Sequence, residues 1–330
     1  MSLASLGGVL LDRGEPSASR EPRLSGAFGG EHVLVPLLPP GAPAVSDQVD
    51  VAVTLARASD AALSLVSPIG DVGTVEDVES EAALLEWAHD RAEKFPEADG
   101  GDFVYTRDVV GGLLGTVRRT DADTLVLPGT SVGRLRSGVT ERLAAAADCD
   151  VVVVNGKPGY DEVASMLLPV AGGPHTGLAT DVARSVAEGC DAWVDVLHVL
   201  PEDASERRRE TARNVLDRAH HRIGRPETTT TWLLEADDVA GTVVEQSRYY
   251  ELTVLGAPTK GRLQRLLHGS TNRSVRAGAQ SVVLSARNND GKCPIDGDDQ
   301  PSAALWTDSE ASTPAEDERH RPSGGYSVTS

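Results

Sequence analysis

A glycine-rich segment followed by a hydroxyl pair is the part of the chain best suited to hold a phosphate group. Gly256-Ala257-Pro258-Thr259-Lys260-Gly261 is followed, eight residues after its last glycine, by Gly269-Ser270-Thr271. Glycines let the backbone come close to an anion, and the N–H groups and positive dipole end of a helix start attract it. A serine there caps the helix or contacts a phosphate oxygen. The same pattern also fits an ordinary strand-to-helix connection, which a short glycine motif alone favours.

The elements around this segment place it at the end of a buried strand. The apolar run Leu252–Leu255 comes directly before it, and a second apolar run, 281–284, follows a short expected helix at 270–278. Strands and helices alternate in this way along most of the chain. Such alternation predicts parallel sheets with right-handed crossovers and helices on both faces.

Periodicity predicts ten strands and seven helices. The strands are expected at residues 32–37, 62–66, 103–105, 124–127, 151–154, 165–170, 193–199, 228–234, 252–255 and 281–284, the third of them weakly. The helices are expected at about 45–58, 78–94, 109–120, 175–188, 203–223, 237–248 and 270–278. The apolar residues of the helices recur at helical spacing, which indicates amphipathic helices packed on a sheet.

The two halves of the chain match each other around the fourth strand of each. Thr124–Pro128 corresponds to Leu252–Gly256, and Gly138-Val139-Thr140-Glu141-Arg142 to Gly269-Ser270-Thr271-Asn272-Arg273. A Gly-Arg-Leu sequence also stands in each half between these two matches. We therefore predict a duplication with two domains, 31–156 and 163–287, joined by a Gly- and Pro-containing linker. The flanking segments 1–30 and 288–330, the second strongly acidic, are expected to be disordered.

With these motifs the chain resembles a tandem universal stress protein of haloarchaeal type over residues 32–287. The resemblance implies two five-stranded parallel sheets of order 3-2-1-4-5, each between helices, as in the adenine nucleotide alpha hydrolase-like fold. Many members of the family bind ATP through a Gly-x2-Gly-x9-Gly-Ser/Thr signature after the fourth strand. Gly256 stands at its first glycine, and Gly269 and Ser270 stand at its last glycine and hydroxyl. Thr259 occupies the second glycine position.

The resemblance also implies which residues surround the two ends of the nucleotide. The phosphate side is assigned to Gly256, Thr259, Gly261, Gly269, Ser270 and Thr271. The adenine side is assigned to Pro169, Val170 and Ala171, which end the first strand, and to Val199, which ends the second. Ala171 stands where ATP-binding members typically carry an aspartate, and Val199 also fits a plain core valine. This pocket lies where the strand order reverses, which is where open α/β sheets bind ligands.

The first half departs further from the family signature. Pro128 replaces the first glycine, Val139 replaces the serine, and the loop from Gly133 to Gly138 is three residues shorter than its counterpart. We predict that this half binds no nucleotide and pairs with the second half through the final strands, 151–154 and 281–284. The sequence also leaves open whether two such chains form a homodimer.

Composition restricts the classes of partner. The formal net charge is −19, and lysine occurs at only four positions, which is typical of proteins from salt-loving archaea. The sequence shows no strong basic patch for nucleic acid. Three widely spaced cysteines predict neither a zinc site nor a disulfide framework. We expect no membrane span, no signal peptide and therefore a cytoplasmic protein.

Two classes of function remain open at this stage. The first is an ATP-binding regulatory protein that uses its second domain, with Mg²⁺ accompanying the nucleotide, no catalytic residue and at most slow hydrolysis, since no general base is evident. The second is a nucleotide-free interaction module that regulates a partner such as a membrane transporter, since similar domains occur beside amino-acid transporters. Thr259 and Ala171 favour the second class, whereas the intact Gly269-Ser270 pair favours the first.

Overall fold

A computed structural model of the chain describes residues 30–38, 44–69, 82–83, 85–86, 98–129, 137–156, 159–160, 163–257 and 282–289. The strands are β1 (His32–Pro36), β2 (Ala62–Ile69), β3 (Ala98–Tyr105), β4 (Thr124–Pro128), β5 (Asp150–Gly156), β6 (Ser165–Pro169), β7 (Trp193–Leu200), β8 (Thr229–Glu235), β9 (Leu252–Gly256) and β10 (Val282–Arg287). The helices are α1 (Ala44–Ser59), α3 (Val109–Arg119), α4 (Ser137–Ala146), α5 (Thr176–Cys190), α6 (Glu206–Ile223) and α7 (Val239–Gln246), with short 3-10 turns at Pro226–Thr228 and Ser247–Tyr249. Nearly all of both predicted tails, most of the helix predicted at 78–94 and all of that at 270–278 lie outside the described residues.

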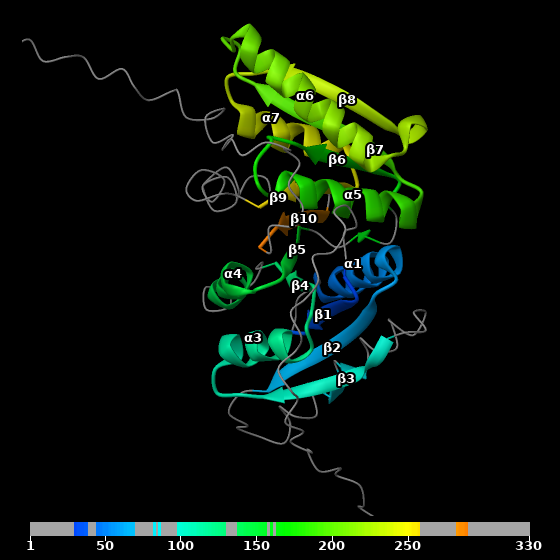
Figure 1. The fold of residues 1–330 in the computed structure, drawn as a ribbon, viewed down its shortest axis with the longest axis vertical. Helices are drawn as coiled ribbons and strands as arrows, with labels where there is room; N and C mark the ends of the chain where they lie inside the picture. Colours follow the sequence, from blue (N-terminus) through cyan, green and yellow to red (C-terminus); the bar gives the residue numbers. More distant parts are fainter. Residues whose placement is uncertain are drawn as a thin grey trace, which may run out of the picture.

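The ten strands form one continuous sheet that runs the length of the molecule (Figure 1). Its order is β3-β2-β1-β4-β5-β10-β9-β6-β7-β8. Read from its outer edge towards the middle, each half has the order 3-2-1-4-5 with parallel pairing inside the half. The predicted α/β fold class is confirmed, and the two predicted sheets are joined edge to edge.

The join is an antiparallel pairing of the two final strands. Val154 lies opposite Leu284, and Val152 lies opposite Ala286. These four side chains are buried in the same core cluster. Both edges of β5 and of β10 are therefore satisfied within the chain, and the predicted pairing of the final strands is observed as an intrachain contact.

Helices cover the two faces of the sheet in separate rows. On one face, α1 packs against α5 and α5 packs against α6, so this row crosses the junction between the halves. On the other face α3 packs against α4 over the first half, and α7 lies over β7 in the second. The largest core cluster joins α1 and α5 to both halves of the sheet. Alternation along β7 explains the two faces: Val194 and Val196 face α5, while Leu197 and Val199 belong to the cluster under α7.

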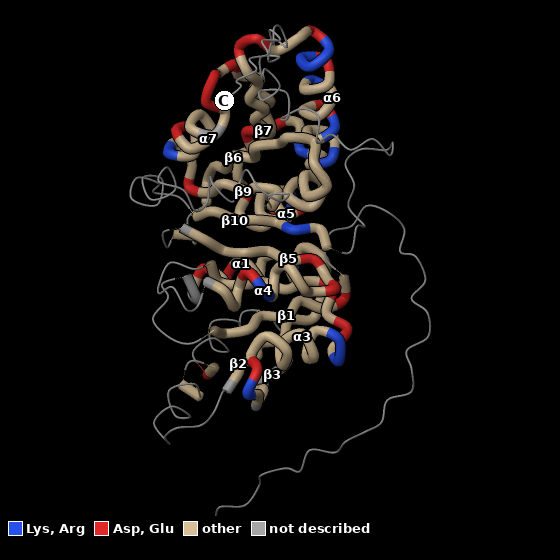
Figure 2. Tube along the Cα trace, turned by 90° about the vertical axis from the view of Figure 1, so that its left-hand side faces the viewer, with Lys and Arg blue, Asp and Glu red and all other residues tan. Residues whose placement is uncertain are grey.

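Arginines gather on α6, where Figure 2 shows most of the basic residues of the second half. Several of them have acidic partners: Arg209 contacts Glu235, Arg213 contacts Glu206, and Arg222 contacts Asp181. The helix begins after Ser205, whose hydroxyl accepts from the Arg208 N–H, and ends at Gly224 with φ of 70°. Its basic residues thus serve largely in ion pairs within the domain.

Candidate functional site

The strand order of the second half reverses between β6 and β9, and three strands end at the same edge there. β6 lies between β7 and β9, and all three run parallel. Their carboxyl ends bring Pro169, Val199 and Gly256 to one edge of the sheet. Open α/β sheets bind ligands in the crevice outside this kind of switch point.

The loop that leaves β6 brings the start of α5 against the end of β9. Gly172 has φ of 72°, a left-handed conformation that glycine adopts without strain. The hydroxyl of Thr176, the first residue of α5, accepts from the N–H of Gly173 at 3.0 Å. A Cβ added to Gly256 would lie 3.1 Å from the carbonyl carbon and oxygen of His175. The glycine at the end of β9 therefore permits a close approach by the residue that caps α5.

A residue after β10 fastens this loop. The backbone N–H of Asn288 donates to Nδ1 of His175 at 3.1 Å, and its side-chain amide donates to the carbonyl of Pro174 at 3.1 Å. Burial, followed by the nearby charge of Arg287, lowers the pKa of His175. A neutral imidazole is required for Nδ1 to accept this hydrogen bond. The loop and the end of the second half therefore form one hydrogen-bonded unit.

A buried histidine lies behind the site, and the sequence patterns did not single it out. His198 on β7 is 1% exposed and hydrogen-bonds to the backbone of Val170, the residue that follows β6. Its Nδ1 has no hydrogen-bond partner among the described residues. Burial lowers the pKa of His198 to about 4, so the ring is neutral at pH 7. A histidine inside the apolar run at residues 196–200 of β7 was the available signal.

The structure brings together half of the predicted site. Pro169 is the last residue of β6, Val170 is buried after it, and Ala171 is half-buried in the loop. Val199 is buried among the residues under α7, so it has the core role that was the alternative for it. Gly256 ends β9. The remaining predicted residues, Thr259, Gly261, Gly269, Ser270 and Thr271, lie outside the described residues.

At the corresponding point of the first half, a buried glutamine bridges the two strands. Gln48 of α1 is fully buried, and its amide nitrogen donates to the carbonyls of Pro36 at 3.0 Å and Val126 at 2.9 Å. These two carbonyls belong to β1 and β4, the strands between which the order reverses. Twelve residues after Pro169, the matching position of the second half is Asp181, which pairs with Arg222 on α6 instead. Gln48 was not identified from the sequence.

Replacing Gln48 with leucine is expected to destabilise the protein by about 1–3 kcal/mol, because two strand carbonyls lose a buried donor. Urea unfolding followed by circular dichroism measures the change. Ser59→Ala on the same helix is a suitable control, since its hydroxyl donates to the carbonyls of Leu55 and Ala56 within the helix. A Gln48→Leu variant as stable as the control would show that the bridge between β1 and β4 contributes nothing.

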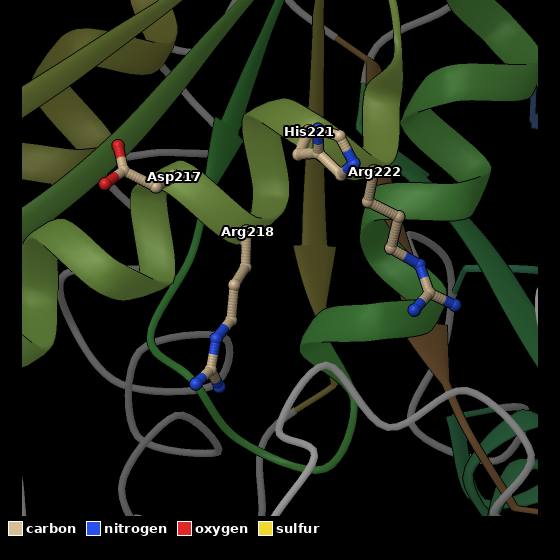
Figure 3. A pocket seen from close by; sticks show the side chains of 4 residues that line it. All are labelled: Asp217, Arg218, His221 and Arg222. Carbon is tan, nitrogen blue, oxygen red and sulfur yellow. The ribbon is translucent and has the colours of Figure 1, made fainter.

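A shallow hollow of about 500 Å³ lies along α6, lined by Asp217, Arg218, His221 and Arg222 (Figure 3). These residues occupy the last turns of α6, which runs back from the carboxyl end of β7 toward the start of β8. The hollow is therefore at the opposite end of the strands from the switch point. The guanidinium of Arg222 is held by Asp181 with two 2.7 Å hydrogen bonds. We do not assign the site to this hollow.

Among the residues that the structure describes, no group of three or more histidine, cysteine, aspartate or glutamate side chains is arranged to hold a metal ion. Within the same part of the chain, no helix has the length and hydropathy needed to cross a membrane.

Comparison with known proteins gives the fold. No protein-family model and no curated protein matches the chain. A putative universal stress protein from Pseudomonas aeruginosa UCBPP-PA14 is 17% identical with a TM-score of 0.55, covering 80% of this chain and 96% of that one. A universal stress protein from Archaeoglobus fulgidus DSM 4304 is 14% identical with a TM-score of 0.51, covering 80% and 98%. The cytoplasmic domain of a prokaryotic cation chloride cotransporter is 12% identical with a TM-score of 0.56, covering 80% and 98%. The chain therefore has the fold of universal stress proteins.

Proposed function

We propose that the protein is a universal stress protein that binds an adenine nucleotide, ATP in the first instance, at the switch point of its second half. The observation that carries this proposal is the difference between the two switch points. Gln48 bridges the strands of the first, whereas the matching Asp181 of the second is committed to Arg222. The second switch point therefore lacks the glutamine bridge of the first, and the glycine-rich segment begins there.

The phosphate side of the proposed site is formed by the start of α5 and the end of β9. The N-cap residue His175 lies against Gly256, so the positive end of the α5 dipole is next to the chain that enters the Gly269-Ser270 segment. A side chain at position 256 would fill this close approach, which fits a cradle made of backbone. Backbone N–H groups would hold the phosphates and Ser270 would add a hydroxyl contact. Bound Mg²⁺ would offset phosphate charge.

The adenine side relies on backbone groups and apolar side chains. Ala171 offers no carboxylate to the base, which removes one specific hydrogen bond of the family pattern. Val170 is buried next to His198, so this part of the loop is held in place by the core. We infer that discrimination between adenine and other bases is modest, because few polar groups contact the ring edge.

Calorimetric titration of the full chain with ATP and Mg²⁺ at about 1 M salt, where charges more than about 3 Å apart are screened, tests the proposal. One nucleotide per chain is the expected stoichiometry. Two per chain would contradict the assignment of a silent first half. No binding by a protein with a folded circular dichroism spectrum would contradict the proposal as a whole.

A matched pair of substitutions locates the site. Gly269→Asp places a carboxylate where phosphate is proposed to bind and is expected to weaken ATP binding by more than about 100-fold, or 2.7 kcal/mol. Gly138→Asp makes the same change at the corresponding position of the first half, where an added Cβ meets no atom within 4 Å. Gly138→Asp should bind ATP with the same affinity as the wild type. Equal effects of the two changes would remove Gly269 from the site.

A nucleotide-free interaction module is the second candidate. Ala171 favours it because the adenine side lacks an acid, and Asn288 favours it because it already ties down the loop at the crevice. A fold neighbour is the cytoplasmic domain of a prokaryotic cation chloride cotransporter, which is a precedent for this fold beside a transporter. Absence of nucleotide binding in the titration would favour this candidate.

A further inference from the structure

The sheet has two outer edges, and they belong to β3 and β8. The final strands β5 and β10 are flanked on both sides, so a second copy of the chain has no free edge to pair with there. Among the strands that the structure describes, β3 and β8 are therefore the two with an edge that another strand can extend. An open strand edge is a template for pairing, and proteins usually protect it with charges, prolines or glycine-rich irregularity.

β3 carries such protection and β8 does not. β3 has the sequence ADGGDFVY, with Asp99, Asp102 and two glycines between them, and its register with β2 shifts along the strand. β8 has the sequence TTTWLLE, which is rich in β-branched and aromatic residues. Its only charged residue, Glu235, is held by Arg209 at 2.7 and 3.2 Å. The one charge of β8 is therefore neutralised by an ion pair, and no other charged residue of the strand would repel a second strand.

One face of β8 is also left open beside this edge. Trp232 is 51% exposed, and its register partner on β7 is Leu197, so both lie on the α7 face. α7 packs mainly against β7, whereas α3, its counterpart in the first half, packs against both β2 and β3. The short helix of the second half thus stops before the outermost strand. A large aromatic side chain remains uncovered at the edge.

Hydrogen bonds hold this tryptophan in one orientation. Its indole N–H donates to the hydroxyl of Thr230 at 3.0 Å, and that hydroxyl donates to the carboxylate of Asp195. The same carboxylate accepts from the hydroxyl of Tyr250 at 2.6 Å. Burial, with Asp195 next in effect, raises the pKa of Tyr250, which keeps it a donor at neutral pH. The chain fixes an exposed aromatic side chain in advance, which lowers the entropy cost of a contact.

We propose that β8 pairs with β8 of a second copy of this chain, antiparallel about a two-fold axis that passes at Trp232. In this register Trp232 lies opposite the partner's Trp232, Thr230 lies opposite the partner's Leu234, and Glu235 lies opposite the partner's Thr229. Aromatic and β-branched cross-strand pairs stabilise antiparallel strands, and no like charges lie directly opposite each other. Both copies use the edge of β8, so the assembly closes as a dimer.

The self-complementary sequence is what favours a second copy over a foreign strand. β3 lacks this property, because antiparallel self-pairing about its glycine pair would set Asp99 opposite the partner's Asp102. The same antiparallel geometry already joins β5 to β10 inside the chain. The dimer would thus extend a sheet whose two halves are related in the same way.

Sedimentation velocity of the full chain at about 0.15 M salt, where a screening length of about 8 Å leaves charges directly across the axis able to interact, tests the proposal. The wild type is expected at twice its 34.6 kDa mass. Trp232→Lys should sediment as a monomer, because two ammonium groups would lie opposite each other. An equimolar mixture of Trp232→Lys and Trp232→Glu should regain the dimer, since opposite charges then meet across the axis.

Trp193→Lys is the matched control: Trp193 is 54% exposed on the same face but lies on β7, whose edges are both paired. It should remain dimeric. A second measurement covers poor folding of the lysine variant: Trp232→Cys should form a disulfide-linked dimer on oxidation, above the background of the wild-type cysteines. A monomeric wild type would overturn the proposal and leave the edge to a foreign strand. Open-ended oligomers, or loss of the dimer in Trp193→Lys, would also overturn it.

Discussion

Replacing Arg222 with methionine is expected to lower the free energy of unfolding by about 3–5 kcal/mol, because it breaks a buried ion pair from one side. Asp181 on α5 is 0% exposed, and both of its carboxylate oxygens accept from the guanidinium of Arg222 at 2.7 Å. Without that partner the carboxylate stays buried in an apolar helix interface. Urea unfolding at pH 7 and high salt measures the loss.

Two further variants separate the buried pair from charge loss in general. Arg209→Met removes an arginine of the same helix whose partner, Glu235, is 40% exposed, and its effect on stability should be much smaller than that of Arg222→Met. Asp181→Leu combined with Arg222→Met replaces the whole pair by apolar groups and should recover most of the stability. A loss below about 1 kcal/mol in Arg222→Met would mean that Asp181 is compensated by other groups.

The same ion pair connects stability to the proposed site. Asp181 is two turns into α5, the helix whose N-cap lies against Gly256. Its ion pair with Arg222 connects α5 to α6. At the corresponding position of the first half, Gln48 of α1 instead bonds to the strands of the sheet. One difference in side chain, Gln48 against Asp181, therefore distinguishes the two switch points, and the proposed nucleotide site rests on this difference.

The order of the strands followed from the sequence because alternating strands and helices permit few topologies, and the family resemblance selects one of them. The pairing of the final strands also followed, since Val151–Val154 is too apolar to remain at an edge. The length of β3 did not follow from the sequence, because only residues 103–105 show the pattern of a strand. The strand extends back to Ala98 because it pairs with β2. Pairing of this kind overrides local propensity.

The candidate site was predicted less completely than the fold. Glycine and hydroxyl spacing pointed to Gly256 and to the segment beyond it, but Gln48 and His198 carried no motif. Both are polar residues at core positions, and their importance depends on contacts made across the fold: Gln48 to two strands, His198 to the backbone after a third. Local sequence does not show such partners. The predictions for Thr259, Gly261, Gly269, Ser270 and Thr271 remain predictions.

Acid is expected to destabilise the protein through His198, by about 3 kcal/mol between pH 7 and pH 4. The folded state holds the pKa of this imidazole at about 4, while an unfolded chain has the ordinary value of 6.5. Between these values the unfolded state binds a proton that the folded state does not, so stability falls as the pH falls. The loss begins near pH 6.5 and is complete below pH 4.

His198→Gln tests this origin, because glutamine keeps a polar side chain at the position but takes up no proton. The free energy of unfolding, measured in urea at pH 7, 5.5 and 4, should fall less steeply in His198→Gln than in the wild type, by about 3 kcal/mol over the range. His221→Gln is the control, since His221 is exposed on α6 and hydrated in both states. Its profile should follow the wild type. Carboxylates contribute acid sensitivity to all three proteins, so only the difference between the two variants measures His198. Parallel profiles for both variants would mean that the imidazole is protonated without cost, and hence that water or a ligand group reaches the buried Nδ1.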